Sequence, residues 1–242
     1  MAERAWPERE YSLALLVLTA ATGAIDGVSY LALDRVFTGN MTGNVLFIGF
    51  GLVGVEGIPV LNNLIALLTF MLGAVLASRI IGRDSGPARL PRSALVLLLV
   101  GTVLVLLLAV VWLAVGAIGT PVMIIITGVL ALLLGGQAAA VKPIGIRDLS
   151  TVVVTMTMVN LSSDSRLAGG RGTAWFRRFA AIGSMGLGAL ASALVTLHLG
   201  GAYALLLAGV VMAVGVLLMG RARRLDLHRG ALARLAEQVT SR

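Results

Sequence analysis

The sequence predicts an all-α polytopic membrane protein with six spanning helices and two broken or re-entrant segments, arranged as two inverted repeats. The 242 residues are 58% hydrophobic and only 12% charged, with a mean hydropathy of +0.99, whereas about a quarter of a soluble domain is charged. Apolar runs of about 20 residues, the length that crosses a bilayer, recur along the chain. The basic residues cluster at only some ends of these runs, as membrane orientation requires.

Six segments have the length and composition of spanning helices. In chain order they are residues 11–33, 59–78, 93–116, 120–141, 179–199 and 203–220. We expect them to form a single transmembrane domain, residues 1–220, with a first repeat at 11–116 and a second at 120–220. Residues 221–242 place leucines among arginines and predict a basic amphipathic tail on the anionic cytoplasmic leaflet.

Two further apolar segments, residues 36–53 and 149–163, fit a spanning helix poorly. The first is rich in Gly, Asn and Thr, and the second has only 15 residues, among them Ser150. If both re-enter, eighteen of the nineteen Lys and Arg residues share the cytoplasmic side and only Arg35 lies outside. If both segments cross the bilayer, twelve basic residues lie on the cytoplasmic side and seven outside. If only the first crosses and the N-terminus lies outside, the numbers are seventeen and two. The count therefore rejects only the double crossing.

An internal repeat favours re-entry of both segments. Asn40-Met41-Thr42 recurs as Thr155-Met156-Thr157, and Leu72-Gly73-Ala74 recurs as Leu187-Gly188-Ala189, both at an offset of 115 residues. Three spans and one re-entrant segment in each half make an odd number of crossings, so the halves have opposite orientation. Inverted repeats of this kind are typical of secondary transporters. Both termini are then expected on the cytoplasmic side.

Polar residues of the two odd segments are the first candidates for a binding site. Non-helical backbone at membrane depth is tolerated where it is buried in protein or lines a wet cavity, and the N-terminus of a half-helix can hold an anion or a polar solute. A capped kink in a packed bundle is the structural alternative. The expected substrate-binding residues are Asn40, Thr42, Asn44, Gln137, Thr155 and Thr157.

Asp26 is the only acidic residue within a long span, and an ionisable group at that depth is by default a functional hypothesis. We expect it to couple transport to an ion, either by binding a proton or, as a carboxylate, by coordinating sodium. The alternative is a structural acid bonded to Ser29, Tyr30 or the end of a neighbouring half-helix. Gln137 holds a similar place in the second half, at an offset of 111, and could equally join helices.

Enzymatic chemistry has little basis in this sequence. There is no cysteine, no GxSxG, HExxH or Walker motif, and the two histidines are far apart. We therefore expect no catalytic residues, no cofactor and no metal site. The basic residues are not interleaved with aromatic ones as a single-stranded nucleic-acid surface would require. The expected partners are the lipid bilayer, a small-molecule solute and a proton or sodium ion, and the small scaffold leaves a homodimer open.

One stretch resembles the signature of the YoaK-like family, bacterial membrane proteins that carry a domain of unknown function. The resemblance rests on Thr22-Gly23-Ala24-Ile25-Asp26, on Tyr30-Leu31 and on the run from Val36 to Asn44. The second half resembles it through Gly136-Gln137-Ala138, although the family usually has Asn where this chain has Ala138. The resemblance implies a bacterial inner-membrane location and candidate transporters, without a substrate.

The sequence thus predicts a transporter of a small polar or anionic solute that works by alternating access and is coupled to protons or sodium. A passive channel is the closest alternative, because opposed half-helices can also line a pore. A third is a membrane scaffold or sensor that uses the basic tail to recruit a partner.

Overall fold

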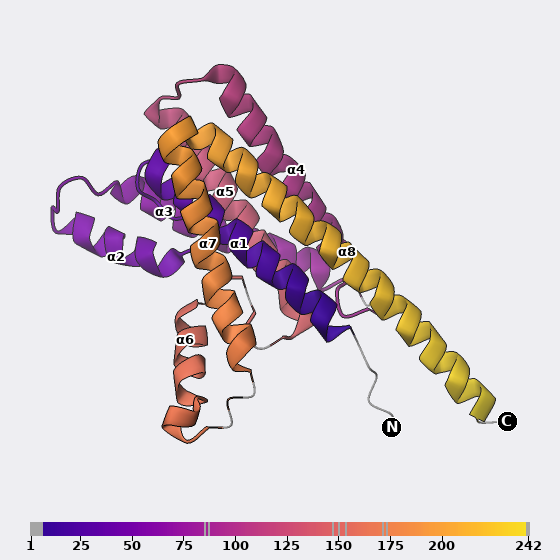
Figure 1. Ribbon diagram of the computed structural model, residues 1–242. Helices are drawn as coiled ribbons and strands as arrows, with labels where there is room; N and C mark the ends of the chain where they lie inside the picture. Colours follow the sequence, from indigo (N-terminus) through magenta and orange to yellow (C-terminus); the bar gives the residue numbers. More distant parts are fainter. Residues whose placement is uncertain are drawn as a thin grey trace.

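The computed structural model describes residues 7–84, 86, 88–146, 148, 149, 151, 152, 154–170, 172 and 174–240. Ser150 and four of the nineteen basic residues, Arg4, Arg147, Arg171 and Arg242, lie outside the described residues. Every regular element described is helical (Figure 1). The α-helices are α1 (Glu8–Ala32), α2 (Met41–Leu52), α3 (Val60–Ile81), α4 (Arg92–Val115), α5 (Thr120–Val141), α6 (Val154–Ser163), α7 (Trp175–Leu199) and α8 (Gly201–Thr240).

Six of these helices, α1, α3, α4, α5, α7 and α8, are long and apolar enough to cross a membrane. The predicted all-α class is therefore confirmed, and the six long apolar helices match the six predicted spans, whereas re-entry and the inverted repeat stay predictions. Prolines mark the start of three of them: Pro59 and Pro91 precede α3 and α4, and Pro121 lies in the first turn of α5. A helix tolerates proline there because the first N–H groups have no partner within the helix.

Helix α8 is longer than the sequence predicts, because it continues without a break beyond Gly220 to Thr240 (Figure 1). Ala, Leu and Arg favour helix in this region, and no proline ends it. The Asp226 carboxylate accepts from the Arg89 N–H at 2.8 Å and from the Tyr11 hydroxyl at 3.3 Å. The first turns of the tail are therefore bonded to α1 and to the loop before α4, and contact of the rest with lipid stays a prediction.

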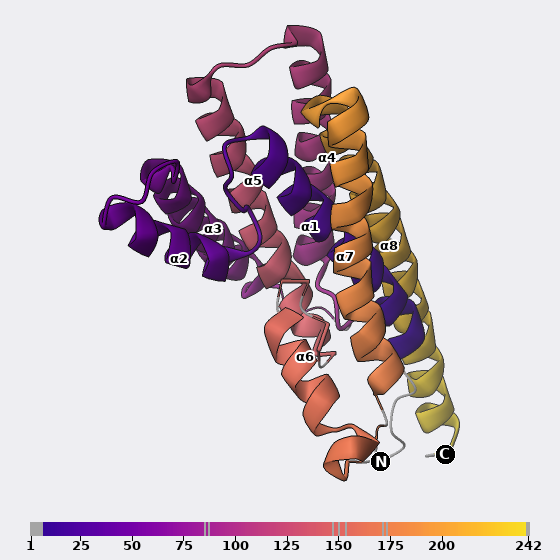
Figure 2. The ribbon, with the colours of Figure 1, turned by 60° about the vertical axis from the view of Figure 1, so that its left-hand side comes forward.

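The helix ends that carry most basic residues lie at one end of the bundle. Figure 2 shows the start of α1, the end of α8 and helix α6 at the lower end, and the α4–α5 and α7–α8 connections at the upper end. Ion pairs across the lower end join Arg177 to Glu8 at 2.9 Å and Arg229 to Glu10 at 3.9 Å. Arg35, which follows the other end of α1, lies apart from them. This arrangement is compatible with the one-sided distribution of charge in the sequence.

Two helix crossings depend on glycine. Where α1 crosses α7, a Cβ on Gly188 would overlap the main-chain carbonyl of Ala20, and one on Gly23 would overlap that of Met185. Backbones can approach this closely only where a side chain is missing, as small-residue interfaces in membranes allow. The α1–α7 pair is therefore in direct backbone contact at this crossing.

The crossing of α3 and α5 has the same form. A Cβ on Gly73 would overlap the carbonyl of Leu132, and one on Gly135 would overlap that of Phe70. Leu132 and Gly135 of α5 lie 112 positions after Ala20 and Gly23 of α1. Met185 and Gly188 of α7 lie 115 positions after Phe70 and Gly73 of α3. The two crossings thus make the same kind of glycine–carbonyl contact, at nearly constant sequence offsets.

Candidate functional site

The loop between α1 and α2 turns back toward α1. Two residues after α1, Asp34 and Arg35 have positive φ angles of 85° and 56°, which are uncommon for residues other than glycine. This reversal brings Thr38 and Gly39, both buried, beside the carboxylate of Asp26. The start of α2 therefore lies next to an acidic residue within the first spanning helix.

Asp26 is 5% exposed and uses its two carboxylate oxygens differently. Oδ1 accepts from the Gly39 N–H at 2.7 Å, from the Thr38 N–H at 2.8 Å and from the Thr38 hydroxyl at 3.2 Å. Oδ2 is buried and has no hydrogen-bond partner among the described residues. The positive end of α2 lies close by and favours the carboxylate charge. One oxygen thus holds the loop, and the other has no hydrogen-bond partner in the described part of the chain.

The sequence left Ser29, Tyr30 and the end of a half-helix open as partners of Asp26, and the hydrogen bonds of the described residues favour the last. The Ser29 hydroxyl donates to the main-chain carbonyl of Asp26 at 3.1 Å rather than to its carboxylate. The carboxylate instead receives main-chain N–H groups just before α2. The half-helix end is therefore the partner of Oδ1.

A cavity of about 340 Å³ adjoins this carboxylate between α1 and α7. Asp26 and Asn40 line it together with Tyr30 and Phe37, and Met185 of α7 lies on the other side. The rings of Tyr30 and Phe37 stack with their centroids 4.9 Å apart, a separation typical of favourable aromatic pairs. The cavity is thus small, largely apolar, and polar where Asp26 and Asn40 reach it.

Gln137 reaches the same region from the second half of the chain. Its Nε2 donates to the Thr22 hydroxyl at 3.0 Å, and this hydroxyl donates to the carbonyl of Leu18. Thr22 lies one turn before Asp26, and a Cβ on Gly39 would come within 2.9 Å of its methyl group. The Oε1 atom of Gln137 is buried without a partner in the described part of the chain. Gln137 therefore joins α5 to the Asp26 site through Thr22.

The other first-half candidates have separate places. Asn44 is buried and is bonded to both main-chain groups of Phe37, donating to its carbonyl at 2.6 Å and accepting from its N–H at 3.0 Å. Asn44 thereby fixes the loop. Asn40 is exposed at the cavity, and Thr42 is exposed on α2. The predicted group of Asn40, Thr42 and Asn44 therefore does not converge on one point.

The second-half candidates belong to another cluster, around Asp148. The Thr157 hydroxyl donates to the Asp148 carbonyl at 3.4 Å, and Thr155 is exposed on α6. Asp148 also accepts from Asn160 at 2.7 Å and forms a 2.7 Å ion pair with Arg178 of α7. Thr155 and Thr157 thus lie apart from the Asp26 site in this structure.

Burial raises the pKa of Asp148, but its hydrogen bonds from Arg178 and Asn160 and the nearby positive charges outweigh this effect and hold the pKa below its usual range. A group with a depressed folded pKa stabilises the fold above the unfolded pKa, about 3.9 for aspartate, and loses this contribution as the pH falls through the folded pKa. The Asp148–Arg178 pair therefore stabilises the folded protein at neutral pH, and this stabilisation is lost in acid.

Replacing Arg178 by glutamine is expected to destabilise the folded protein by about 2 kcal/mol at pH 7, because it leaves the buried Asp148 carboxylate without its charged partner. The difference from the unsubstituted protein should shrink below about pH 4, where the carboxyl becomes protonated. Thermal unfolding in detergent at both pH values measures this. The exposed Arg83 provides the matched control, Arg83→Gln, and equal midpoints for the two variants would contradict the prediction.

A similar contact occurs in the first half. The Asp34 carboxylate accepts from the side chain of Asn62, near the start of α3, at 2.7 Å. Both Asp34 and Asp148 follow the first long helix of their half and have positive φ angles, 85° and 67°. Neither Asp34 nor Asp148 was among the predicted site residues. An aspartate shortly after α1 and another shortly after α5 could have indicated both.

Comparisons with known proteins place this site in a family. A family model described as a protein of unknown function, DUF1275, matches residues 14–218, which include the whole Asp26 site. The UPF0700 transmembrane protein YoaK of Bacillus subtilis (strain 168) is 32% identical over 156 residues, 64% of this chain and 67% of YoaK. No solved structure matches.

Proposed function

The chain belongs to the DUF1275 family of proteins of unknown function, as a distant homologue of YoaK, and we propose that it is a proton-coupled transporter of a small polar solute. It is a multi-pass membrane protein with six candidate spans. The single observation that carries the proposal is the Asp26 carboxylate, which is buried in a spanning helix with one oxygen bonded and the other unpaired. Such groups are costly in a membrane and mark ion pathways and proton relays.

The surroundings of Asp26 favour a proton over sodium as the coupling ion. A proton needs only one oxygen, and Oδ2 offers one. A hard metal cation takes several oxygen ligands, whereas aromatic and aliphatic side chains such as Tyr30, Phe37 and Met185 form much of the adjoining cavity. The transport experiment described below distinguishes coupling to sodium from coupling to protons.

The same geometry favours a polar solute over an anionic one. The N–H groups of Thr38 and Gly39, which the sequence offered to an anion, already donate to Asp26. A solute anion in the cavity would also lie close to this carboxylate, and like charges repel. A cavity of about 340 Å³ accommodates a small molecule. We therefore propose a solute that donates hydrogen bonds to Asp26 and that Asn40 orients.

Coupling follows from the two roles of the carboxylate. Hydrogen bonds to a charged acceptor are roughly twice as strong as those to a neutral one. Protonation of Asp26 weakens its hold on Thr38 and Gly39 and frees the start of α2 to move. Loss of the proton restores the hold. The loop is thus the element that alternates, in keeping with transporters built around discontinuous helices.

The duplicated crossings support the proposal that the two halves are inverted repeats. Corresponding glycines make the α1–α7 and α3–α5 contacts, and both crossings use the same reciprocal pattern of glycine and carbonyl. The aspartates that follow α1 and α5 add a second correspondence, because each binds a side chain near the start of the next long helix. Alternating access in such proteins moves one repeat against the other.

Contacts at the ends of α2 support its re-entry on the side where α1 ends. Asp34, just after α1, is bonded to Asn62 near the start of α3. A Cβ on Gly51, near the end of α2, would overlap the side chain of Val60. The chain thus leaves α1, reaches back to Asp26, and returns through α2 to the level where α3 begins. The proposed topology has both termini cytoplasmic, on the basic side.

Cysteine labelling tests this topology in a chain that has no native cysteine. Arg35→Cys and Glu56→Cys, both at exposed positions, should react with a membrane-impermeant reagent from outside intact cells. Arg83→Cys, at the other end of the bundle, should react only after permeabilisation. Labelling of positions 35 and 56 from opposite sides would contradict re-entry of α2.

Transport itself is tested with purified protein in lipid vesicles and a library of radiolabelled small solutes. A proton gradient should drive accumulation of one solute class above the level of protein-free vesicles. Accumulation that follows a sodium gradient instead would replace the coupling ion. Uptake that equilibrates without regard to either gradient would identify a channel and overturn the proposal.

A further inference from the structure

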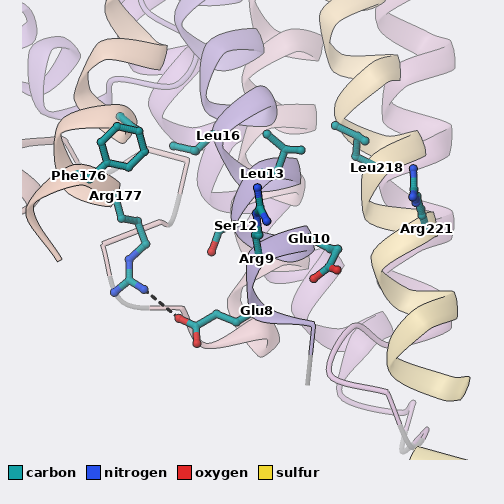
Figure 3. Close-up of a pocket in the computed structure, with 11 residues that line it drawn as sticks. Glu8, Arg9, Glu10, Ser12, Leu13, Leu16, Phe176, Arg177, Leu218 and Arg221 are labelled. Atoms are coloured by element: carbon teal, nitrogen blue, oxygen red, sulfur yellow. Dashed lines mark hydrogen bonds and ion pairs between the residues drawn. The ribbon is translucent and has the colours of Figure 1, made fainter. Parts of the chain in front are cut away.

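A second cavity, of about 780 Å³, lies at the end of the bundle where α1 begins. It is a groove between the first turns of α1, the first turns of α7 and the part of α8 near Leu218 and Arg221 (Figure 3). Leu13, Leu16 and Phe176 contribute an apolar wall. Leu13 is 52% exposed and Phe176 69% exposed. The groove therefore presents apolar surface that no part of the described chain covers.

The rim of this groove carries charge. Figure 3 shows Glu8, Arg9 and Glu10 below the leucines of the wall, with the Arg177 guanidinium reaching toward Glu8. Arg177 pairs with Glu8 at 2.9 Å, and Glu10 lies 3.9 Å from Arg229. Both carboxylates of the rim are therefore neutralised by arginines.

Positive charge remains after this pairing. Within the described chain, Arg9 and Arg221 are exposed and have no carboxylate partner, and the Nε atom of Arg177 is buried without a hydrogen-bond partner. The N-termini of α1 and α7 add partial positive charge at the same end. The groove thus combines an unpaired donor, two free guanidinium groups and two helix N-termini.

The position of the groove along the candidate spans indicates its depth in a membrane. All three of its helices are candidate spans. In the proposed orientation, Leu13 and Leu16, one to two turns inside α1, and Leu218 of α8 would face hydrocarbon, and the charged residues at the start of α1 would lie at the level of the lipid headgroups. Arginines at such positions extend their charged ends to the interface. A molecule that fits this pattern has a negative head and an apolar chain.

We propose that this groove binds one anionic phospholipid, with its phosphate among Arg9, Arg177 and Arg221 and an acyl chain along Leu13, Leu16 and Leu218. Basic pockets between spanning helices on the cytoplasmic side recognise acidic headgroups in this way. The acyl chain distinguishes this ligand from free phosphate, which would gain nothing from the apolar wall.

The test compares lipids retained by the purified protein in native mass spectrometry. The double variant Arg9→Gln, Arg221→Gln should bind phosphatidylglycerol about thirtyfold more weakly than the unsubstituted protein, because each of the two basic residues contributes about 1 kcal/mol near an anionic surface and about 1.4 kcal/mol is a factor of ten in affinity. The matched control, Arg79→Gln with Arg83→Gln, removes two exposed arginines of the same end outside the groove and should bind normally. Inorganic phosphate should not displace the lipid.

Thermal unfolding in phosphatidylcholine micelles should be unchanged in both double variants, which shows that they are folded. Equal phosphatidylglycerol binding by the two double variants would overturn the proposal. So would equally tight retention of phosphatidylcholine by the unsubstituted protein, or displacement by phosphate. None of these outcomes depends on the transport proposal, since binding is measured without uptake.

Discussion

Replacing Asp26 by asparagine is expected to abolish solute accumulation driven by a proton gradient while leaving the protein folded. The amide oxygen of asparagine can still accept from the Thr38 and Gly39 N–H groups, which now meet Oδ1 at 2.8 and 2.7 Å. Asparagine cannot bind or release a proton at this position. The substitution therefore separates the anchoring role of the side chain from its proton-binding role.

Uptake into vesicles measures this effect, with accumulation by Asp26→Asn falling to that of protein-free vesicles. Asp34→Asn is the matched control, because it makes the same chemical change in an acid of the same loop that bonds to Asn62 instead. Its accumulation should remain near that of the unsubstituted protein. Undiminished gradient-driven uptake by Asp26→Asn would show that Asp26 only holds the loop.

Substitution of Gly188 by valine should prevent stable folding, with a cost of about 3 kcal/mol or more. A side chain at this position would overlap the carbonyl of Ala20, and main chain cannot yield as a flexible side chain can. The α1–α7 pair would have to separate, and the wall of the Asp26 cavity would open with it. Gly73→Val should have a similar effect, since Gly73 makes the same contact with Leu132.

Gly186→Val provides the control, because this residue is on the same helix and nothing lies within 4 Å of a Cβ added there. The yield of monodisperse protein in detergent and the thermal midpoint compare the variants. Gly188→Val and Gly73→Val should be lost to aggregation, and Gly186→Val should behave normally. Equal yields and midpoints for all three would mean that the helices do not cross as described.

The spanning helices could be predicted because their length and hydropathy are properties of contiguous residues. Asp26 could be selected for the same reason, as an acid within an apolar run. Its partners could not, because Thr38 and Gly39 reach it only through a reversal at Asp34 and Arg35 that requires positive φ angles. No periodicity in the sequence encodes that turn.

The structure does not bring the expected binding residues together on one surface, and their binding role stays a prediction. Thr42 and Thr157 match in the repeat, yet Thr42 is exposed on α2 whereas Thr157 is buried on α6. Gln137 does reach the site, but through Thr22. The Asp148–Arg178 pair joins residues 30 positions apart, and such pairing depends on how α6 and α7 pack rather than on local pattern.

The proposed repeat gives Asp26 no acidic counterpart in the second half. The offset of 112 residues that relates Gly23 to Gly135 relates Asp26 to Ala138. The second half therefore has a methyl group where the first has its acid. The proposed transporter would therefore carry one proton in each cycle.

Infrared difference spectroscopy on the protein in lipid tests most directly whether Asp26 exchanges a proton. A pH change should produce the carbonyl-stretch signal of a buried carboxyl becoming protonated. Asp26→Asn should remove this signal, and Asp34→Asn should retain it. Identical difference spectra for the unsubstituted protein and Asp26→Asn would instead show that Asp26 is a fixed charge that only anchors Thr38 and Gly39.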